Sequence, residues 1–234
     1  MLFRSLKDGA KMSKSLGNTV DPSVIVDQYG ADTARLFILF GAPVERDLDW
    51  SDTAVEGCFR FLGRVYRTVV SDDIQPTTDE AGLTKMVHKT IKGVTQDIQR
   101  FSYNTAISKL MELVNFMTQK GCSDAAREAL VKLMAPFAPF IAEELWQRLG
   151  QKQSVHIQPW PEYDDALTID TDVVMVVQVN GKVRDKLSVA RDTDKEAVKT
   201  LVFASEKVQK FVADQQIVKE IFVPNKLFNI VVKP

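Results

Sequence analysis

The sequence has little of what a metal centre or a disulfide framework requires, with two cysteines and two histidines in 234 residues. Cys58 and Cys122 each lie in a stretch of helical periodicity, which favours buried, reduced thiols over a disulfide bond. The two histidines, His88 and His156, are distant in sequence and form no metal-binding cluster with the cysteines. We therefore expect no structural metal.

Long apolar runs are also missing. The longest runs, such as residues 36–40 and 173–177, are far too short to span a bilayer, which takes roughly 20 residues. The N-terminus, MLFRSLKDGAKMSKS, has no apolar core like that of a secretory signal. The composition, 45% hydrophobic and 26% charged, is ordinary for a soluble globular protein. We expect a cytoplasmic protein that does not enter a membrane.

The net charge of −1 gives no overall indication of a nucleic-acid partner, but the charge is unevenly distributed. Residues 173–234 hold 11 lysines and arginines against 7 acidic residues, a net +4. The preceding residues hold 19 basic against 24 acidic residues, a net −5. A basic terminal module on an acidic body favours a polyanionic partner for that module.

Two short helices are predicted near the N-terminus, after a polar loop over the first twenty residues. Asp21 and Pro22 have the residue types of a helix N-cap and first turn, and Gly30 ends that helix. Residues 32–40 form the second predicted helix, which Gly41 and Pro43 stop.

From residue 51 to residue 150 the apolar residues recur at helical spacing over four long segments. The predicted helix starts are Ser51, Thr77 with Glu80 as a capping box, Asn104 and Ser123. Pro136 and Pro139 should kink or break the fourth helix. Four amphipathic helices in series with short connections predict an antiparallel four-helix bundle.

The last module changes to strand periodicity. Asn180 and Gly181 stand between two strand-like runs, which is a strong hairpin signal. Two short helices, capped by Asp194 and Ser205, and two further strands follow. The predicted order ββααββ makes a small α+β unit after a mainly α body. We divide the chain into residues 1–50, a helical part at 51–172 that ends in an extended tether, and the α+β unit at 173–234.

The residues with the clearest chemistry are KMSKS at positions 11–15, followed by LGN. Two ammonium groups and two hydroxyls on a loop flanked by Gly9 and Gly17 can surround a polyphosphate while staying mobile. This string, continued as KMSKSLGNTVDPSVIVDQYGADTARLFILF, resembles the signature segment of class I aminoacyl-tRNA synthetases. In that family such a loop leads into a short pair of helices.

Three later stretches resemble the leucine branch of this family. They are RDLDWS at 46–51 with VEG at 55–57 and RFL at 60–62, VQVNGKVR at 177–184, and FVPNKLFNIVV at 222–232. APFAPFIAEELW at 135–146 is shared more widely in the family. The resemblance covers essentially the whole chain and implies that it is the C-terminal portion of a larger bacterial-type enzyme.

The resemblance also implies roles for individual residues. Lys14 is the implied catalytic residue and would contact the phosphates of ATP, while Lys11 and Ser13 would bind ATP and shape the loop. The helical part would lie along the leucine-accepting tRNA without reading its anticodon. The terminal module would reach the tRNA elbow, where Lys182, Arg184 and Lys186 are the candidate RNA contacts. The implied partners are tRNA(Leu), ATP with Mg²⁺, and leucine, in a monomeric enzyme.

The other ATP-site tetrapeptide of this family, His-Ile-Gly-His or a close variant, is absent from the sequence. We therefore expect that this chain alone does not catalyse the reaction. A valine or isoleucine enzyme is the nearest alternative, which the VNGKVR-type terminal module disfavours. A free-standing tRNA-binding module is the other alternative, and such a module would not need the loop at residues 11–15.

Overall fold

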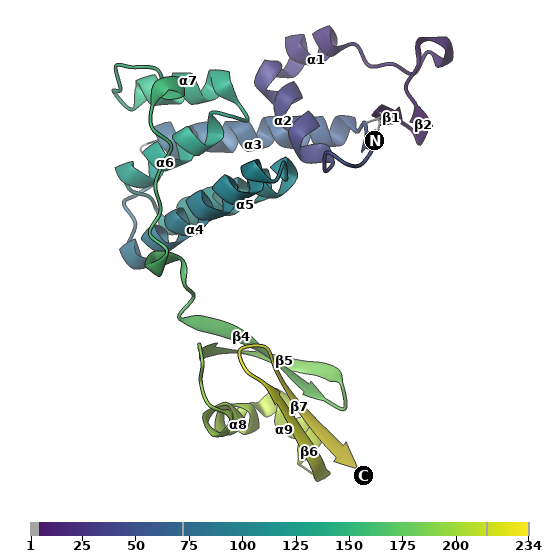
Figure 1. The fold of residues 1–234 in the computed structure, drawn as a ribbon, viewed down its shortest axis with the longest axis vertical. Helices are drawn as coiled ribbons and strands as arrows, with labels where there is room; N and C mark the ends of the chain where they lie inside the picture. The colour runs from purple at the N-terminus through teal and green to yellow at the C-terminus, as the bar shows by residue number, and fades with distance from the viewer. Residues whose placement is uncertain (1–4, 72, 214, 234) are drawn as a thin grey trace. The chain divides into compact units, whose positions relative to one another are not determined.

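The structure is a computed structural model that describes residues 5–71, 73–213 and 215–233. The chain divides into two compact units, Met1–Thr168 and Ile169–Pro234, and it is rich in helices with two small sheets (Figure 1). None of the helices in these described ranges is both long enough and apolar enough to cross a membrane. Each unit is described by itself below.

The first unit begins with a small three-stranded sheet of order β2-β1-β3. Strands β1 (Ser5–Lys7) and β2 (Ala10–Lys11) are antiparallel, and the turn between them places Asp8 and Gly9 at φ 54° and 73°. Strand β3 (Leu48–Asp49) pairs with β1 in parallel. The chain therefore leaves this sheet after β2 and returns to it some 37 residues later, because Lys11 and Leu48 end and begin the two strands.

The excursion from the sheet contains a 3₁₀ turn, η1 (Lys14–Leu16), and the helices α1 (Pro22–Tyr29) and α2 (Ala31–Gly41). The predicted cap is confirmed, since the Asp21 side chain accepts a hydrogen bond from the Ser23 amide at 2.9 Å. Gly30, at φ 85°, separates the two helices as expected. Ile25 of α1 and Leu36 and Phe37 of α2 are buried in the core of the first unit.

Five helices follow in the described part of this unit: α3 (Asp52–Val70), α4 (Glu80–Gln99), α5 (Tyr103–Lys120), α6 (Asp124–Met134) and α7 (Pro139–Arg148). Helices α4 and α5 run side by side and are joined by a short turn (Figure 1). The apolar faces of all five helices meet in one core, in which Val65 of α3, Leu110 of α5 and Leu133 of α6 are fully buried. The predicted fourth helix is two helices, because the segment with Pro136 breaks it before Pro139 begins α7.

Two predicted helix caps are wrong. The cap of α4 is Asp79, whose side chain accepts from the Gly82 amide at 2.9 Å, while Thr77 accepts from the Asp79 amide instead. Helix α5 begins two residues before the predicted position, so Asn104 lies inside its first turn and Ser102 is the N-cap. In both places several capping residue types stand close together, and sequence spacing does not choose among them.

Residues 149–168 connect the helices to the second unit with only short 3₁₀ turns, η2 (Val155–Ile157) and η3 (Ala166–Thr168). Hydrogen bonds fix the second half of this segment along α4, while Ser154 and Val155 in the first half donate to Glu143 of α7. Trp160 Nε1 donates to Thr95 Oγ1 at 2.8 Å, and the Asp164 amide donates to His88 Nδ1 at 2.9 Å. Lys92 Nζ donates to Asp165 at 2.7 Å, which adds an ion pair.

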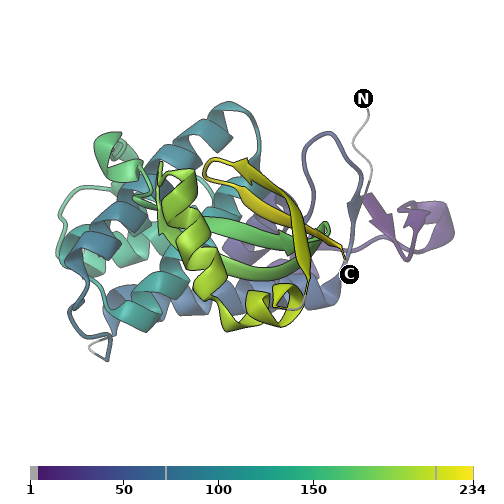
Figure 2. The same ribbon diagram turned by 90° about the horizontal axis from the view of Figure 1, so that it is seen from below.

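The second unit is a four-stranded sheet of order β5-β4-β7-β6 with two helices. Its elements are β4 (Asp172–Val179), β5 (Lys182–Ala190), α8 (Lys195–Ala204), α9 (Glu206–Val212), β6 (Gln216–Val223) and β7 (Leu227–Lys233). The order ββααββ is the predicted one. The two hairpins lie next to each other through the parallel pair β4–β7 (Figures 1 and 2).

One face of this sheet carries the core of the second unit. Met175 and Val177 of β4 and Phe228 and Ile230 of β7 alternate with more exposed residues, as strand geometry requires. They pack against apolar residues of α8 and α9 that are also buried, namely Val198, Val202, Val208 and Val212. The core is small, which is the usual condition of a unit of about 60 residues.

Candidate functional site

The KMSKS residues lie between the edge strand β2 and helix α1. Lys11 ends β2, Ser13 is the N-cap of the 3₁₀ turn, and Lys14 is its first residue. Gly17 closes the turn at φ 63°, a conformation that residues with a side chain adopt at a cost. The side chains of Lys11 and Lys14 are both exposed.

Asn18 joins the two ends of this loop. Its Oδ1 accepts from the Ser13 amide at 2.9 Å, and its Nδ2 donates to the Lys11 carbonyl at 3.2 Å. Inside the loop, the Leu16 amide donates to the Ser13 carbonyl at 3.2 Å, and the Ser13 and Ser15 hydroxyls are 3.1 Å apart. We call this structure, residues 11–18, the phosphate loop. Its backbone is bonded internally, and both of its lysine side chains are exposed.

The donor set of the phosphate loop fits a polyphosphate. Ammonium and hydroxyl groups are hydrogen-bond donors to phosphate oxygens, and the five residues of KMSKS include no carboxylate that would repel them. Within the described residues, no group of three or more His, Cys, Asp or Glu side chains could hold a metal ion.

The second group of candidate residues lies on β5, where a bulge divides them between two faces of the sheet. Val177 pairs with Asp185 but the next residue, Gln178, pairs with Val183, so Arg184 is the additional residue. Lys182 pairs with the buried Val179 and therefore lies on the helix-covered face.

Lys186 lies on the opposite face of the sheet. It pairs with Val176, whose neighbours Met175 and Val177 point into the core. The structure thus brings Lys182 and Arg184 together and separates Lys186 from them.

Lys182 and Arg184 line a groove of about 360 Å³ together with Lys210, Phe211 and Gln215. The Arg184 guanidinium lies over the Phe211 ring, 3.8 Å from its centroid. Its Nε is buried and has no hydrogen-bond partner among the described residues. We call this the basic groove. Three cations and an aromatic ring under a guanidinium form a surface suited to a phosphate backbone.

Sequence reasoning missed Asn18, Lys210 and Phe211. Asn18 stands in the LGN continuation of the motif, and asparagine's ability to bond to nearby backbone could have indicated its role. Lys210 and Phe211 come from α9, and no pattern in the sequence places that helix beside β5. Both cysteines are free and buried, and burial raises the pKa of the Cys58 thiol to about 11.

Comparison with known proteins identifies the class. Residues 81–199 match the family described as the anticodon-binding domain of tRNA ligase, and residues 3–51 match class I tRNA synthetases of the I, L, M and V group. The chain belongs to this family of class I tRNA ligases.

Within the family, the chain corresponds to the C-terminal region of leucine–tRNA ligases. It is 46% identical to the leucine–tRNA ligase of Geobacter sp. strain M21 over 250 residues, and 48% identical to that of Geotalea uraniireducens strain Rf4 over 248 residues. Each alignment covers 97% of this chain and 30% of the relative. The predicted leucine branch is thereby confirmed.

A solved structure is also similar. It is the Agrobacterium radiobacter K84 agnB2 LeuRS in a ternary complex with tRNA and LeuAMS. The match has a TM-score of 0.74 and 30% sequence identity, and it covers 99% of this chain and 33% of the other. This chain therefore spans about a third of the length of the proteins it matches.

Proposed function

We propose that this chain is the part of a leucine–tRNA ligase that supplies the phosphate loop and the tRNA-docking surfaces. The parent enzyme joins leucine to ATP, forming leucyl-adenylate and pyrophosphate, and then transfers leucine to tRNA(Leu). The observation that carries the proposal is the KMSKS loop with exposed Lys11 and Lys14, in a chain similar to leucine–tRNA ligases over 97% of its length. Such an enzyme works in the cytoplasm.

Lys14 is the proposed catalytic residue. When leucine attacks the α-phosphate, negative charge moves onto the departing pyrophosphate, so a positioned ammonium group stabilises the transition state more than the ground state. Lys11 and the Ser13 hydroxyl would bind the same phosphates. The short 3₁₀ turn that Ser13 caps would set the position of Lys14.

We further propose three functional parts. Residues 1–50 complete the catalytic domain, helices α3 to α7 form the antiparallel bundle of the anticodon-binding class, and residues 173–234 bind tRNA. The bundle would dock on the inner side of the tRNA, and the basic groove of the terminal part would contact phosphates. Docking by lysine and arginine carries little base information, so this binding should tolerate changes of RNA sequence.

The test is leucine-dependent exchange of pyrophosphate into ATP by the full-length parent protein. Lys14→Ala should lower the activation rate by roughly 10²–10³, the size typical of losing one preorganised electrostatic partner. Lys14→Arg keeps the charge but changes its reach, so it should restore only part of the rate. Lys152→Ala, an exposed lysine on the connecting segment, is the control.

Two outcomes would contradict the proposal. A Lys14→Ala protein that activates leucine at the unaltered rate would remove the catalytic role of the loop. Leucine-dependent exchange above background by the purified 234-residue chain alone would show that we have misjudged which residues the reaction needs. Leucine affinity and unfolding temperature should not change in Lys14→Ala, because an exposed loop lysine contributes little to folding.

A further inference from the structure

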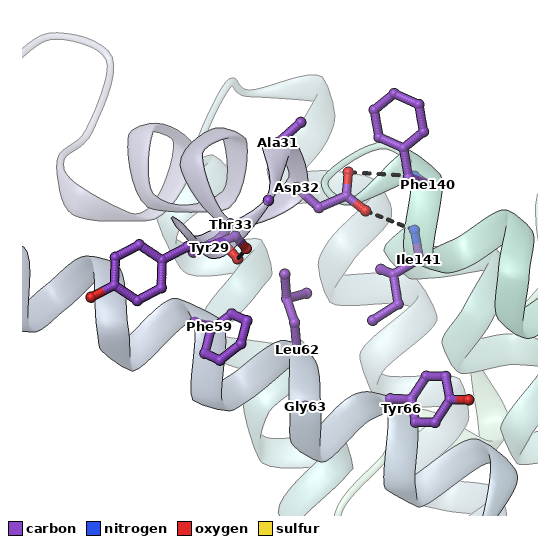
Figure 3. Close-up of a pocket in the computed structure, with 11 residues that line it drawn as sticks. Tyr29, Ala31, Asp32, Thr33, Phe59, Leu62, Gly63, Tyr66, Phe140 and Ile141 are labelled. Carbon is purple, nitrogen blue, oxygen red and sulfur yellow. Dashed lines mark hydrogen bonds between the residues drawn. The ribbon is translucent and has the colours of Figure 1, made fainter. Parts of the chain in front are cut away.

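Helix α2 is joined to the α6–α7 corner by two charged side chains one turn apart. The Asp32 carboxylate accepts from two backbone amides at the start of α7, Phe140 at 3.3 Å and Ile141 at 2.7 Å (Figure 3). Arg35 donates to the carbonyl of Pro136, with Nη2 at 3.0 Å and Nε at 3.4 Å. These contacts connect residues more than 100 positions apart.

Helix α7 does not supply its own cap. Its N-cap position is Ala138, which makes no side-chain hydrogen bond, and Pro139 at the first turn has no amide hydrogen. Alanine is among the poorest N-cap residues. The side chain of Asp32, 8% exposed, fills this role from another helix.

The two charges also match the helix ends that they contact. The start of α7 is electropositive and faces the Asp32 carboxylate, while the carbonyls that follow α6 are electronegative and face Arg35. One turn of α2 therefore carries a charge of the right sign for each of the two helix ends. Exchanging the two charges would place each of them against a helix end of the same sign.

A cavity of about 630 Å³ lies between α2, α3 and α7, with Tyr29, Phe59, Tyr66 and Phe140 among its walls (Figure 3). Around this cavity, the N-terminal end of α2 is held by the polar contacts of Asp32 and Arg35 and by apolar packing, in which the Tyr29 ring meets the Phe59 ring at 5.6 Å. Further along, Leu36 and Phe37 are buried in the common core.

The path of the chain connects this corner to the phosphate loop. The loop, α1 and α2 form one excursion from the β2-β1-β3 sheet, and the β1–β3 pair closes its base. The loop is therefore held at one end by the sheet and at the other by α1 and α2. Helix α2 in turn contacts the corner between α6 and α7 through Asp32 and Arg35.

We propose that Asp32 and Arg35 are positioning residues, and that together they form a latch that holds the α1–α2 pair, and through it the phosphate loop, on the helical body. The latch makes the position of the phosphate loop depend on the α6–α7 corner. An RNA docked on these helices can then bias the loop, and by linkage the loop can bias RNA docking. This inference rests on the proposed function for the role of the loop.

The first test uses the 234-residue chain and measures hydrogen exchange of individual amides by NMR. In Asp32→Asn one carboxylate oxygen becomes an amino group facing a backbone amide, so a capping bond is removed. Exchange at Phe140 and Ile141 should rise severalfold, because one of the two bonds and the negative charge at the start of α7 are lost. The amides of α1 and of the first turns of α2 should rise with them.

The controls separate a latch from a general loss of stability. Asp27→Asn, an exposed aspartate of α1, should change none of these rates. Amides around Leu110 in α5 should keep their rates in Asp32→Asn, because global unfolding would raise every rate by one factor. If Phe140 and Ile141 exchange faster while α1 and α2 do not, Asp32 only caps α7 and the latch is refuted. No change at any of these amides refutes it too.

The second test uses the full-length parent protein. Arg35→Lys keeps the charge but cannot reproduce the guanidinium contact with the Pro136 carbonyl. It should lower kcat for pyrophosphate exchange about tenfold with the KM for leucine unchanged, as expected when a loop is slightly misplaced. If the hydrogen-exchange rates of the 234-residue chain change but the kcat of the full-length protein does not, the latch stands and the proposed role of the loop fails. If the short chain shows no response, the latch itself fails.

Discussion

At the residue scale, Asn18 gives the phosphate loop its shape. Its amide group bonds to the Ser13 amide and the Lys11 carbonyl, which stand on the two sides of the loop. Because the loop is exposed, water can replace these bonds without much loss of folding free energy. The loop would then sample several conformations, and Lys14 would spend less time in its active position.

We therefore expect Asn18→Ala to lower the rate of leucine activation by the parent enzyme about ten- to a hundredfold, with no change in unfolding temperature. The neighbouring exposed Thr19→Ala is the matched control. Pyrophosphate exchange and thermal unfolding measure the two effects. An unchanged exchange rate would mean that the Asn18 bonds do not determine the loop conformation during the reaction.

Residue types predicted some of the helix caps and missed those of α4 and α5. Asp21 and Asp194 cap α1 and α8 with hydrogen bonds of 2.9 Å, as their positions before apolar helical segments indicate. The role of Asp32 could not be predicted in this way. It caps a helix that begins more than 100 residues later, and no local pattern contains that contact.

Glu220 gives the second unit a dependence on pH. It forms ion pairs with Lys199 at 2.8 Å and Lys195 at 3.5 Å, and the hydrogen bond from Lys199 is the largest cause of its lowered pKa. Asp185 also has a lowered pKa, chiefly because the Ser205 hydroxyl donates to it. A carboxyl group whose pKa is lowered by folding stabilises the fold above its unfolded pKa, and that stability is lost as the pH falls through the folded pKa.

The second unit should therefore lose stability below a pH of about 4.5, the usual pKa of glutamate. Glu220→Gln should unfold at a lower temperature at pH 7 and lose less on acidification, because the titrating group is gone. Glu206→Gln, an exposed glutamate in α9, is the control. Thermal unfolding followed by the amide signals of β6 and β7 between pH 3 and pH 7 measures this. Equal pH profiles for Glu220→Gln and the unaltered chain would contradict it.

At the element scale, the hairpin of β4 and β5 shows why a sequence signal was correct and also incomplete. Asn180 and Gly181 both have positive φ, 49° and 77°, as the predicted two-residue turn requires. The Asn180 side chain also bonds to both backbone groups of Val232 on β7, at 2.9 Å and 3.2 Å. The turn is thus joined to the C-terminal strand, a contact that turn propensities do not contain.

Asn180→Ala should lower the free energy of unfolding of the second unit by about 2–3 kcal/mol, since it combines a left-handed backbone with the loss of two hydrogen bonds. Asn180→Gly accepts the backbone conformation and loses only the bonds, so its effect should be about half as large. Denaturant unfolding followed by the amide signals of β4 measures both. Trp50, Trp146 and Trp160 all lie in the first unit, so fluorescence would not report on this one. Equal losses in the two variants would show that the bonds to Val232 contribute everything.

The bulge in β5 is the element that separated the candidate RNA contacts. Alternation along a regular strand would place Lys182, Arg184 and Lys186 on one face. The additional residue at Arg184 shifts the alternation, so that Lys182 faces the helices and Lys186 does not. A bulge depends on the pairing of two strands, and the sequence of β5 alone does not contain it.

At the scale of the whole molecule, the change of apolar period near residue 172 was visible in the sequence, and the chain divides after Thr168. Each unit has its own hydrophobic core. In the sequence, the apolar residues of the first unit recur at helical spacing, and those of the second unit recur at both strand and helical spacing. The sequence alone does not predict where charged residues lie together on the surface of each unit. The basic groove is lined by residues of β5 and α9, so it forms only where these two elements pack together.

The basic groove leads to a prediction about RNA binding by the full chain. Lys182→Glu and Lys186→Glu change the charge equally on the same strand but on opposite faces, so they form a matched pair. We expect Lys182→Glu, and Lys210→Glu from α9, to weaken tRNA binding about three- to tenfold at moderate salt. The slope of log K against log salt should become shallower by about 0.7–0.9 for each phosphate that the protein no longer neutralises.

Lys186→Glu should have a small effect, because a charge on the far face of the sheet acts on the RNA only through screened, long-range attraction. Filter binding or fluorescence anisotropy with tRNA over a salt series measures all three variants. Equal weakening by Lys182→Glu and Lys186→Glu would mean that net charge rather than the groove attracts the RNA. Weakening by Lys186→Glu alone would place the RNA on the open face of the sheet, with α8 and α9 directed away from it.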